Sequence, residues 1–495
     1  MLRMNHLVRW PSGLVQELHD LPLNRRIWVE EGSEKVRSEP FNQARSEGRP
    51  AADAAAKGKE TLPSTVETWL LAPVSAPDFS LPDLTGRAQT LAALRGKPVL
   101  LNLWVARSAI CQQNLSVCNR LYAKWAGHGL QLMTVNVDES GDSDTLRTFA
   151  REHNLSLCIL RGSEDVAGIY NILYRYLLDR HRDLELPTSF LINDQGEIVK
   201  VYQGPINPEH VEYDFRHIPQ TPAERMARAL PFPGISEVTE FQRNYLSLGS
   251  VFFQRGYYDQ AEVWFQRAVH DDPSSAEASY GLGSVYLRQS KNAEAQQSFE
   301  RVIKLQASYP DTLPDAWNNL GVLAMRQERA ADSVECFQEA LRLNPNHLLA
   351  LDNLGNAYRQ QKRWDEARKV LERALRVNAQ DAEANYSLGM IYAQTDDTDR
   401  AYEYLQRALN ARPAYPEALN NLGILYLVTE RPDKAVASFE QCIRVAPAFD
   451  QPYLNLARIY VQEGAPDKAR AVLQELLKQQ PGHEQARKMM EELPR

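Results

Sequence analysis

A repeated pattern dominates the second half of this 495-residue chain. Its period is about 34 residues, and self-similarity at such a fixed period indicates stacked copies of one supersecondary unit. Each unit has a Gly (Ala in the last unit) that is followed twelve positions later by a small residue, and four positions after that by Phe or Leu. A Leu-Gly pair marks each unit, except the last, which has Leu-Ala, and the step from the second unit to the third is longer than the others. The Leu of the pair is Leu248, Leu282, Leu320, Leu354, Leu388, Leu422 and Leu456.

Each unit has the pattern of two antiparallel helices. Gly and Ala are expected where the helices cross closely, and the larger apolar side chains fill the space between them. A Pro closes most units, because Pro lacks the N–H and its ring clashes with the preceding turn. One unit cannot bury its apolar face alone, so the units must stack. The pattern resembles the tetratricopeptide repeat, with seven units over residues 242–483 and a capping helix at 484–495.

The resemblance implies a superhelix whose concave groove is lined by the first helix of each unit. Such grooves bind peptides or proteins. The residues that we expect to line the groove are polar and aromatic, a mixture that suits an extended peptide. They lack the Lys-rich set with which other tetratricopeptide-repeat proteins hold a C-terminal carboxylate. A second set, Asn319, Asn353, Asn421 and Asn455, is expected to hold neighbouring repeats together instead. The groove candidates are Tyr280, Asn318, Asp352, Asn356, Arg359, Tyr386, Met390, Asn420 and Arg458.

Residues 73–204 alternate strand-like and helix-like segments, which predicts an α/β sheet domain. Three segments resemble thioredoxin-like redoxins of the alkyl hydroperoxide reductase and extracytoplasmic reductase groups: residues 76–86, residues 94–98, and Leu186-Pro187-Thr188. The resemblance implies that Pro187 is cis and faces the start of the first long helix. The predicted fold is therefore multidomain, with an α/β thioredoxin-like domain followed by an all-α repeat superhelix. Strands are expected at 99–105, 130–137, 155–160, 189–193 and 198–202, and helices at 109–126, 143–153 and 164–179.

Ser108-Ala-Ile-Cys111 stands where the redoxin family carries Cys-x-x-Cys. Dithiol exchange needs one sulfur to attack and another to resolve the mixed disulfide, and an unactivated serine is a poor nucleophile. We therefore expect dithiol exchange to be lost, with Cys111, Ser108 and Pro187 forming a residual redox site. The alternative is a thiol oxidoreductase or one-cysteine peroxidase using Cys111. Peroxiredoxins of this fold carry Thr or Ser three residues before their reactive Cys, although Trp104 replaces the Pro expected upstream.

Composition excludes several other functions. The net charge is −8 and no long basic block exists, so nucleic acid is not an expected partner. The apolar stretches fall far short of the roughly 18 residues that a membrane span needs. Five cysteines show no metal-ligand spacing, so neither a metal nor another cofactor is expected. The sequence predicts a protein-interaction scaffold whose repeats bind a peptide or protein.

Residues 1–32 contain Arg9-Trp-Pro-Ser-Gly13 between two strand-like runs, and Pro-Ser-Gly favours a turn. They resemble the C-terminal end of ASPIC/UnbV domains, which commonly occur in exported proteins. So short a remnant should not fold alone, so we expect an upstream part to be missing. The resemblance implies a periplasmic or extracytoplasmic location; without a signal peptide, a complete chain would be cytoplasmic. Residues 33–72 and 205–241 are expected linkers, the second with a short helix near 223–229.

Overall fold

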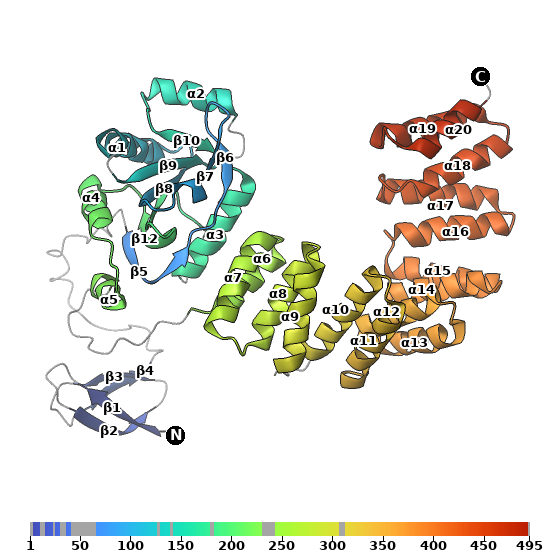
Figure 1. The fold of residues 1–495 in the computed structure, drawn as a ribbon, viewed down its shortest axis with the longest axis horizontal. Helices are drawn as coiled ribbons and strands as arrows, with labels where there is room; N and C mark the ends of the chain where they lie inside the picture. The colour runs from blue at the N-terminus through green and yellow to red at the C-terminus, as the bar shows by residue number, and fades with distance from the viewer. Residues whose placement is uncertain are drawn as a thin grey trace, which may run out of the picture. The chain divides into compact units, whose positions relative to one another are not determined.

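A computed structural model describes residues 66–125, 129–138, 142–178, 183–229, 243–305 and 312–493, and the backbone of four strands nearer the N-terminus (Figure 1). The chain divides into two compact units, Met1–Arg243 and Asn244–Arg495. The four N-terminal strands form two antiparallel pairs, β1 (Arg3–Arg9) with β2 (Val15–Pro22), and β3 (Arg25–Val29) with β4 (Val36–Pro40).

The pairing of β1 with β2 confirms the two strands predicted on either side of Pro-Ser-Gly. The turn residues themselves lie outside the described residues, as do residues 41–65 of the first expected linker. β4 lies inside the range expected as that linker and pairs with β3 over its whole length. Its sequence, Val-Arg-Ser-Glu-Pro, has a single large apolar residue, so the pairing leaves little trace in the hydrophobic pattern.

A six-stranded sheet forms the centre of the first unit, in the order β10-β9-β8-β11-β12-β5. The central strand β8 is buried at every position, as expected of a strand covered on both faces. It runs parallel to β9, and β9 runs parallel to β10, whereas the other neighbours pair antiparallel. The strands are β5 (Val66–Ser75), β8 (Val99–Trp104), β9 (Gln131–Asn136), β10 (Cys158–Arg161), β11 (Thr188–Ile192) and β12 (Glu197–Gln203).

Helices cover the sheet, and every predicted strand and helix of this domain is present. The core on one face joins Leu100 and Trp104 of the sheet to Leu115 of α1 and Val211 of α4. On the opposite face, α3 contributes buried aromatic side chains such as Tyr170. The remaining elements are β6 (Ser80–Pro82), β7 (Ala88–Thr90), η1 (Ala92–Leu94), α1 (Ala109–Trp125), α2 (Ser143–Glu152), α3 (Glu164–Leu178), α4 (Pro208–Arg216) and α5 (Pro222–Ala229).

Two elements of this domain, β5 and α4, lie partly or wholly in ranges expected as linkers. A buried charge network fixes both to β12. Lys200 Nζ of β12 lies 2.5 Å from Asp214 Oδ2 of α4 and 2.7 Å from Glu67 Oε2 of β5. Tyr202 OH donates to the same Asp214 oxygen at 2.7 Å. The sheet domain therefore includes β5, from Val66, and α4, beyond both expected ends.

The second unit is all helical, and Figure 1 shows its helix pairs following one another along the chain. Close helix crossings explain the repeated Gly: a Cβ at Gly321 would lie 2.4 Å from the Phe337 ring. The pairs are α6 (Tyr245–Gln254) with α7 (Tyr258–Asp271), α8 (Ala276–Arg288) with α9 (Asn292–Leu305), α10 (Thr312–Arg326) with α11 (Ala330–Leu343), α12 (Leu348–Gln360) with α13 (Trp364–Val377), α14 (Ala382–Gln394) with α15 (Thr398–Ala411), α16 (Pro416–Val428) with α17 (Pro432–Val445), and α18 (Gln451–Gln462) with α19 (Pro466–Gln479), followed by α20 (Glu484–Glu492).

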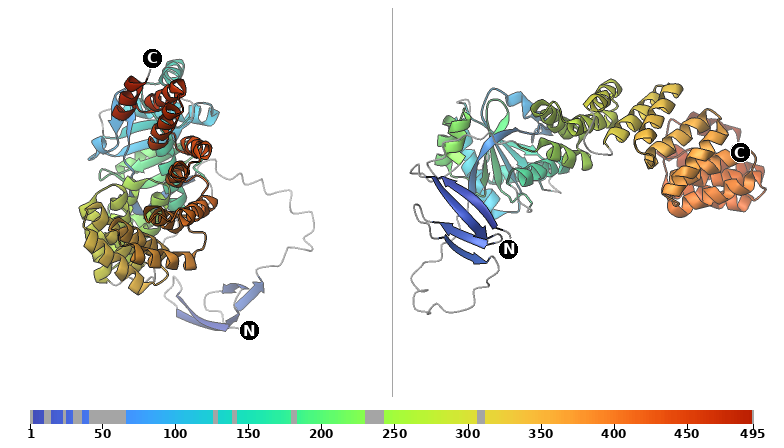
Figure 2. Two further views of the ribbon diagram at one scale, coloured as in Figure 1. Left: turned by 90° about the vertical axis from the view of Figure 1, so that its right-hand side faces the viewer. Right: turned by 90° about the horizontal axis from the view of Figure 1, so that it is seen from below.

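The first helices of successive pairs contact one another from α6 to α16, more closely than the second helices do. The array therefore curves toward its first helices, and Figure 2 gives two further views of it. We call the surface formed by α6, α8, α10, α12, α14, α16 and α18 the inner face. Within the described parts of the chain, no helix is both long and apolar enough to cross a membrane, and no metal-binding group of three His, Cys, Asp or Glu side chains occurs.

Candidate functional site

The first candidate site lies where β8 leads into α1. Ser108 precedes the first residue of α1, and its hydroxyl oxygen accepts a hydrogen bond from the Cys111 N–H at 3.3 Å. Its carbonyl accepts from the Gln112 N–H at 3.0 Å. This is the geometry of a helix N-cap, which satisfies an N–H group that has no partner inside the helix. Ser108 therefore stabilises the start of α1.

The thiol of Cys111 is fully buried. It belongs to the same core cluster as Trp104 and Leu115. Cys118, seven residues further along α1, is also fully buried, and burial raises the pKa of its thiol to about 12. The thiolate is the reactive form of cysteine, so the surroundings of Cys118 oppose reactivity. Cys111 can meet a solvent-borne reagent only if the start of α1 opens.

Pro187 lies next to the same end of the sheet. The Leu186–Pro187 peptide bond is cis, as predicted. Thr188 pairs with Leu103 across the antiparallel strands β11 and β8, which places Pro187 opposite Trp104, four residues before Ser108. The structure thus brings the three predicted residues to one end of the sheet. The sequence interpretation missed the exposed Ile110 between Ser108 and Cys111, whose side chain is 51% accessible.

The second candidate site is the inner face of the repeat array, where polar side chains join successive first helices. These bonds confirm that the four predicted Asn residues hold neighbouring repeats together. They also occupy part of the hydrogen-bonding capacity of four groove candidates. The bonds run from Asn319 Nδ2 to Tyr280 OH (3.5 Å), from Asn353 Nδ2 to Asn318 Oδ1 (2.9 Å), from Asn421 Nδ2 to Tyr386 OH (3.0 Å) and from Asn455 Nδ2 to Asn420 Oδ1 (3.2 Å).

The other predicted groove residues differ in how firmly they are held. Arg359 directs Nε and one terminal nitrogen at Asn356 Oδ1, at 3.0 and 2.8 Å, so its guanidinium is fixed against its own helix. Arg458 is exposed and makes a longer contact of 3.4 Å with Asn455 Oδ1. Met390 is half-buried. Ile424, at the same repeat position one unit later, is 39% accessible, so this part of the face offers apolar surface that the sequence interpretation did not include.

Asp352 is the exception on this face. It occupies the repeat position of Asn318 and Tyr386, yet its Oδ1 is buried without a hydrogen-bond partner among the described residues. Burial is the main cause that raises the pKa of its carboxyl to about 8, and the negative charges of Asp381 and Glu383 add to the effect. A buried polar group without a partner is costly, so Asp352 is the least satisfied member of the predicted set.

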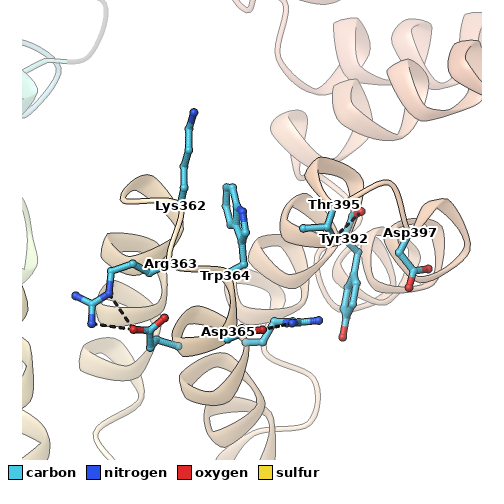
Figure 3. Close-up of a pocket in the computed structure, with 9 residues that line it drawn as sticks. Lys362, Arg363, Trp364, Asp365, Tyr392, Thr395 and Asp397 are labelled. Atoms are coloured by element: carbon cyan, nitrogen blue, oxygen red, sulfur yellow. Dashed lines mark hydrogen bonds and ion pairs between the residues drawn. The ribbon is translucent and has the colours of Figure 1, made fainter.

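A separate pocket of about 430 Å³ lies at the turns of the fourth and fifth repeats (Figure 3). Both arginines of the pocket pair with acidic side chains, Arg363 with Glu366 at 3.0 Å and Arg368 with Asp365, whereas Figure 3 shows Lys362 pointing away from them. The arginines of the pocket are therefore occupied by neighbours on one helix, α13. The pocket is lined by Lys362, Arg363, Trp364, Asp365, Glu366, Arg368, Tyr392, Thr395 and Asp397.

Fold and sites together define a thioredoxin-like redoxin domain joined to a tetratricopeptide-repeat array. Residues 74–201 match the AhpC/TSA family, residues 429–493 match a tetratricopeptide repeat, and residues 235–417 match the C-terminal domain of cilia and flagella-associated protein 70. The thiol-disulfide oxidoreductase ResA of Geobacillus kaustophilus is 32% identical over 155 residues, which cover 31% of this chain and 80% of ResA. The chain therefore belongs, through its sheet domain, to the AhpC/TSA family, with ResA proteins among its relatives.

ResA of Bacillus subtilis is similar over the same domain, with 28% identity over 143 residues, 29% of this chain and 73% of that protein. Among solved structures, pilF of Pseudomonas aeruginosa is 24% identical and covers 43% of this chain and 96% of its own, with a TM-score of 0.38. A tetratricopeptide repeat protein of Parabacteroides merdae is 17% identical and covers 50% of this chain and 96% of its own, with a TM-score of 0.40.

Proposed function

We propose that this protein is an interaction scaffold. Its repeats bind a peptide or protein on the inner face, and its thioredoxin-like domain no longer carries out dithiol exchange at the usual position. The observation that carries the redox half of the proposal is the pair Ser108 and Cys111. The hydroxyl of Ser108 occupies the position of attack and caps α1, while the remaining thiol is fully buried.

Restoring a cysteine at position 108 tests the loss of dithiol exchange. The chain as it stands is expected not to accelerate reduction of insulin disulfides by dithiothreitol. Ser108→Cys is expected to gain that activity, because it supplies a sulfur at a helix N-terminus, where the pKa of a thiol is lowered. The double variant Ser108→Cys/Cys111→Ala is the control that removes the resolving thiol. Insulin reduction by the unmodified chain at the rate of Ser108→Cys would contradict the proposal.

The binding half of the proposal is supported by the composition of the inner face. Half-buried Tyr386 and Met390 supply apolar surface beside the polar Asn356, a mixture that suits an extended peptide. Panning a phage-displayed library of random dodecapeptides on the full chain tests this. We expect enriched peptides whose binding is lost when Met390→Arg places a charged side chain on the inner face. Enriched peptides that bind the variant as well as the parent would contradict binding at this face.

A second candidate is thiol-based peroxidase or oxidoreductase chemistry at Cys111. The contact of Ser108 with the Cys111 N–H favours it, since a hydroxyl lies beside the start of the same helix turn as the thiol. The reaction requires the buried sulfur to become accessible. Maleimide labelling of the folded chain with and without hydrogen peroxide tests this: rapid, peroxide-sensitive modification that disappears in Cys111→Ala supports the second candidate, and resistance to labelling rejects it.

For the remaining segments we propose the organisation expected from the sequence. Residues 1–32 are proposed to be the C-terminal end of an ASPIC/UnbV domain, which places the protein in the periplasm or outside the cell. The Arg9-Trp-Pro-Ser-Gly13 motif and the β1–β2 pair around it support this. Fusion of the full chain to alkaline phosphatase in its native host, with its own upstream DNA, tests the location: phosphatase activity is expected, and an inactive fusion would contradict the proposal.

A further inference from the structure

Hydrogen bonds join the first helices at four of the six steps between successive repeats, and all four follow one rule. In each of these four bonds, the residue two positions before one repeat Leu accepts from the residue directly before the next repeat Leu. The first step has Leu246 and Gly281, which carry no polar side chain, and the interruption lies in the step from the fourth repeat to the fifth, where the two positions are Asp352 and Ser387. Asp352 makes no hydrogen bond or ion pair within the described residues, and its Oδ1 is shut off from water. The interruption lies in the middle of the seven repeats, with intact bonds on both sides.

Replacing the pair by the residues of a neighbouring repeat would close the interruption. The flanking bond uses Asn318 as acceptor and Asn353 as donor, at 2.9 Å. Ser387 is 3% accessible and its side chain makes no bond to Asp352, so nothing on the next helix compensates the carboxyl. The Asp352 side chain is only half-buried, so it can be reached from the inner face. An unpartnered carboxyl that remains reachable is suited to a partner from outside the array.

The charges around Asp352 favour a cation. The charges of Asp381 and Glu383, both negative, add to the effect of burial in raising the pKa of Asp352. Glu383 is already held by Arg412 at 2.8 Å and by Tyr415 OH at 2.6 Å. Asp381 caps the start of α14 by accepting from a backbone N–H at 2.8 Å. Asp352 therefore has two acidic neighbours in its electrostatic surroundings and no cation paired with it among the described residues.

We propose that Asp352 determines the specificity of the inner face by receiving a basic group, the side chain of Arg or Lys, from the bound peptide. The inference rests on the proposed peptide binding and names the ligand chemistry that this site selects. The bound cation and the carboxylate form a partly buried, charge-assisted pair, which is shorter and stronger than a neutral hydrogen bond. Neighbouring repeats, with Asn or Tyr at this position, have no comparable preference.

The pH dependence of binding follows from the state of the free protein. Burial and the two carboxylates hold the pKa of free Asp352 at about 8, and a bound cation lowers that pKa. Binding below pH 8 therefore releases a proton, and the affinity rises by up to about tenfold per pH unit until pH 8 is passed. A neutral carboxyl that donated a hydrogen bond to a peptide carbonyl would give the opposite sign, with affinity falling above pH 8.

The experiment uses dodecapeptides enriched on the full chain at pH 8.5, synthesised with a fluorophore and measured by anisotropy. Norleucine replaces each basic residue of the peptide in turn. A copy acetylated at its amino terminus shows whether the binding group is a basic side chain or the terminal amino group. We expect one basic residue whose replacement weakens binding more than tenfold on the parent but not on Asp352→Asn. Glu372→Gln, an exposed carboxyl on the second helix α13, makes the same charge change and is expected to leave affinity unchanged.

The outcomes separate this inference from the proposed function. If Met390→Arg abolishes binding while norleucine peptides and Asp352→Asn bind as tightly as the parents, peptide binding stands and the role of Asp352 is refuted. An affinity that falls above pH 8, or that depends only on the free amino terminus, also refutes a basic side chain as the ligand group. If no enriched peptide depends on the inner face, both proposals fail together.

Discussion

Replacing Asp352 by Asn should stabilise the repeat array at neutral and alkaline pH, without any ligand. The amide has nearly the size of the carboxyl and carries no charge, so it removes the cost of ionising a half-buried acid. The folded-state pKa is about 8 against an ordinary value of 3.8. Between these values the folded protein holds a proton that the unfolded chain has lost. Stability of the parent chain therefore falls as pH rises from about 4 to 8, and is level above 8.

The magnitude follows from the size of the shift. Each pKa unit corresponds to about 1.4 kcal/mol, so the full difference sets an upper limit of about 6 kcal/mol. The side chain keeps part of its surface exposed, and water screens the ionised form, so we expect about 2 kcal/mol of added stability at pH 8.5. The gain of Asp352→Asn over the parent should be small at pH 5 and grow between pH 5 and pH 8.

Urea unfolding of the full chain, followed by far-ultraviolet circular dichroism from pH 5 to pH 9, measures this difference. The array contributes most of the helix, so its midpoint dominates the signal. Glu372→Gln is the matched control, because it removes an exposed carboxyl from the same array and should shift the midpoint little at any pH. Equal pH dependence of the parent and Asp352→Asn would refute the claim that the carboxyl is buried without a partner.

Three further substitutions test the packing described above. Gly321→Ala places a Cβ 2.4 Å from the Phe337 ring and should cost about 1–3 kcal/mol in thermal unfolding; an unchanged midpoint would contradict the close crossing. Lys200→Met leaves Asp214 buried without its cation, so a loss of about 3 kcal/mol is expected by urea unfolding, whereas a neutral result would mean that water already reaches the pair. His347→Ala removes the ring nitrogen that caps α12, at about 1 kcal/mol, seen as faster amide exchange confined to the first turn of α12.

The repeat array could be predicted because its strongest constraints recur in every unit. Gly321 and Phe337 are forced on the sequence by a helix crossing that is the same from one repeat to the next, so the pattern is read seven times over. In the sheet domain, β8 and its neighbours β9 and β11 are buried at nearly every position and are largely apolar, which also leaves a clear signal.

The elements that escaped prediction are those held by contacts distant in sequence. β5 is an edge strand, and its position depends on Glu67 meeting Lys200, 133 residues later. Asp352 could be placed on the inner face from its repeat position, but its lack of a partner depends on what the next helix presents at position 387. No local pattern around Asp352 contains that information. Tertiary register therefore decides which of the predicted groove residues is free to meet a ligand.

The proposed loss of the attacking thiol at position 108 would change the chemistry available at the start of α1. A thiol at that position would gain reactivity from the exposed N–H groups of the helix, and it would cap the helix poorly because sulfur is a weak acceptor. Serine lacks that reactivity but caps the helix better, because its oxygen accepts a hydrogen bond from the Cys111 N–H. This bond stabilises the first turn of α1, in which the Cys111 thiol is fully buried. The exposed Ile110 side chain lies at this end of the domain beside exposed Arg107 and Ala109, and under the proposed scaffold function this apolar side chain would contact another protein.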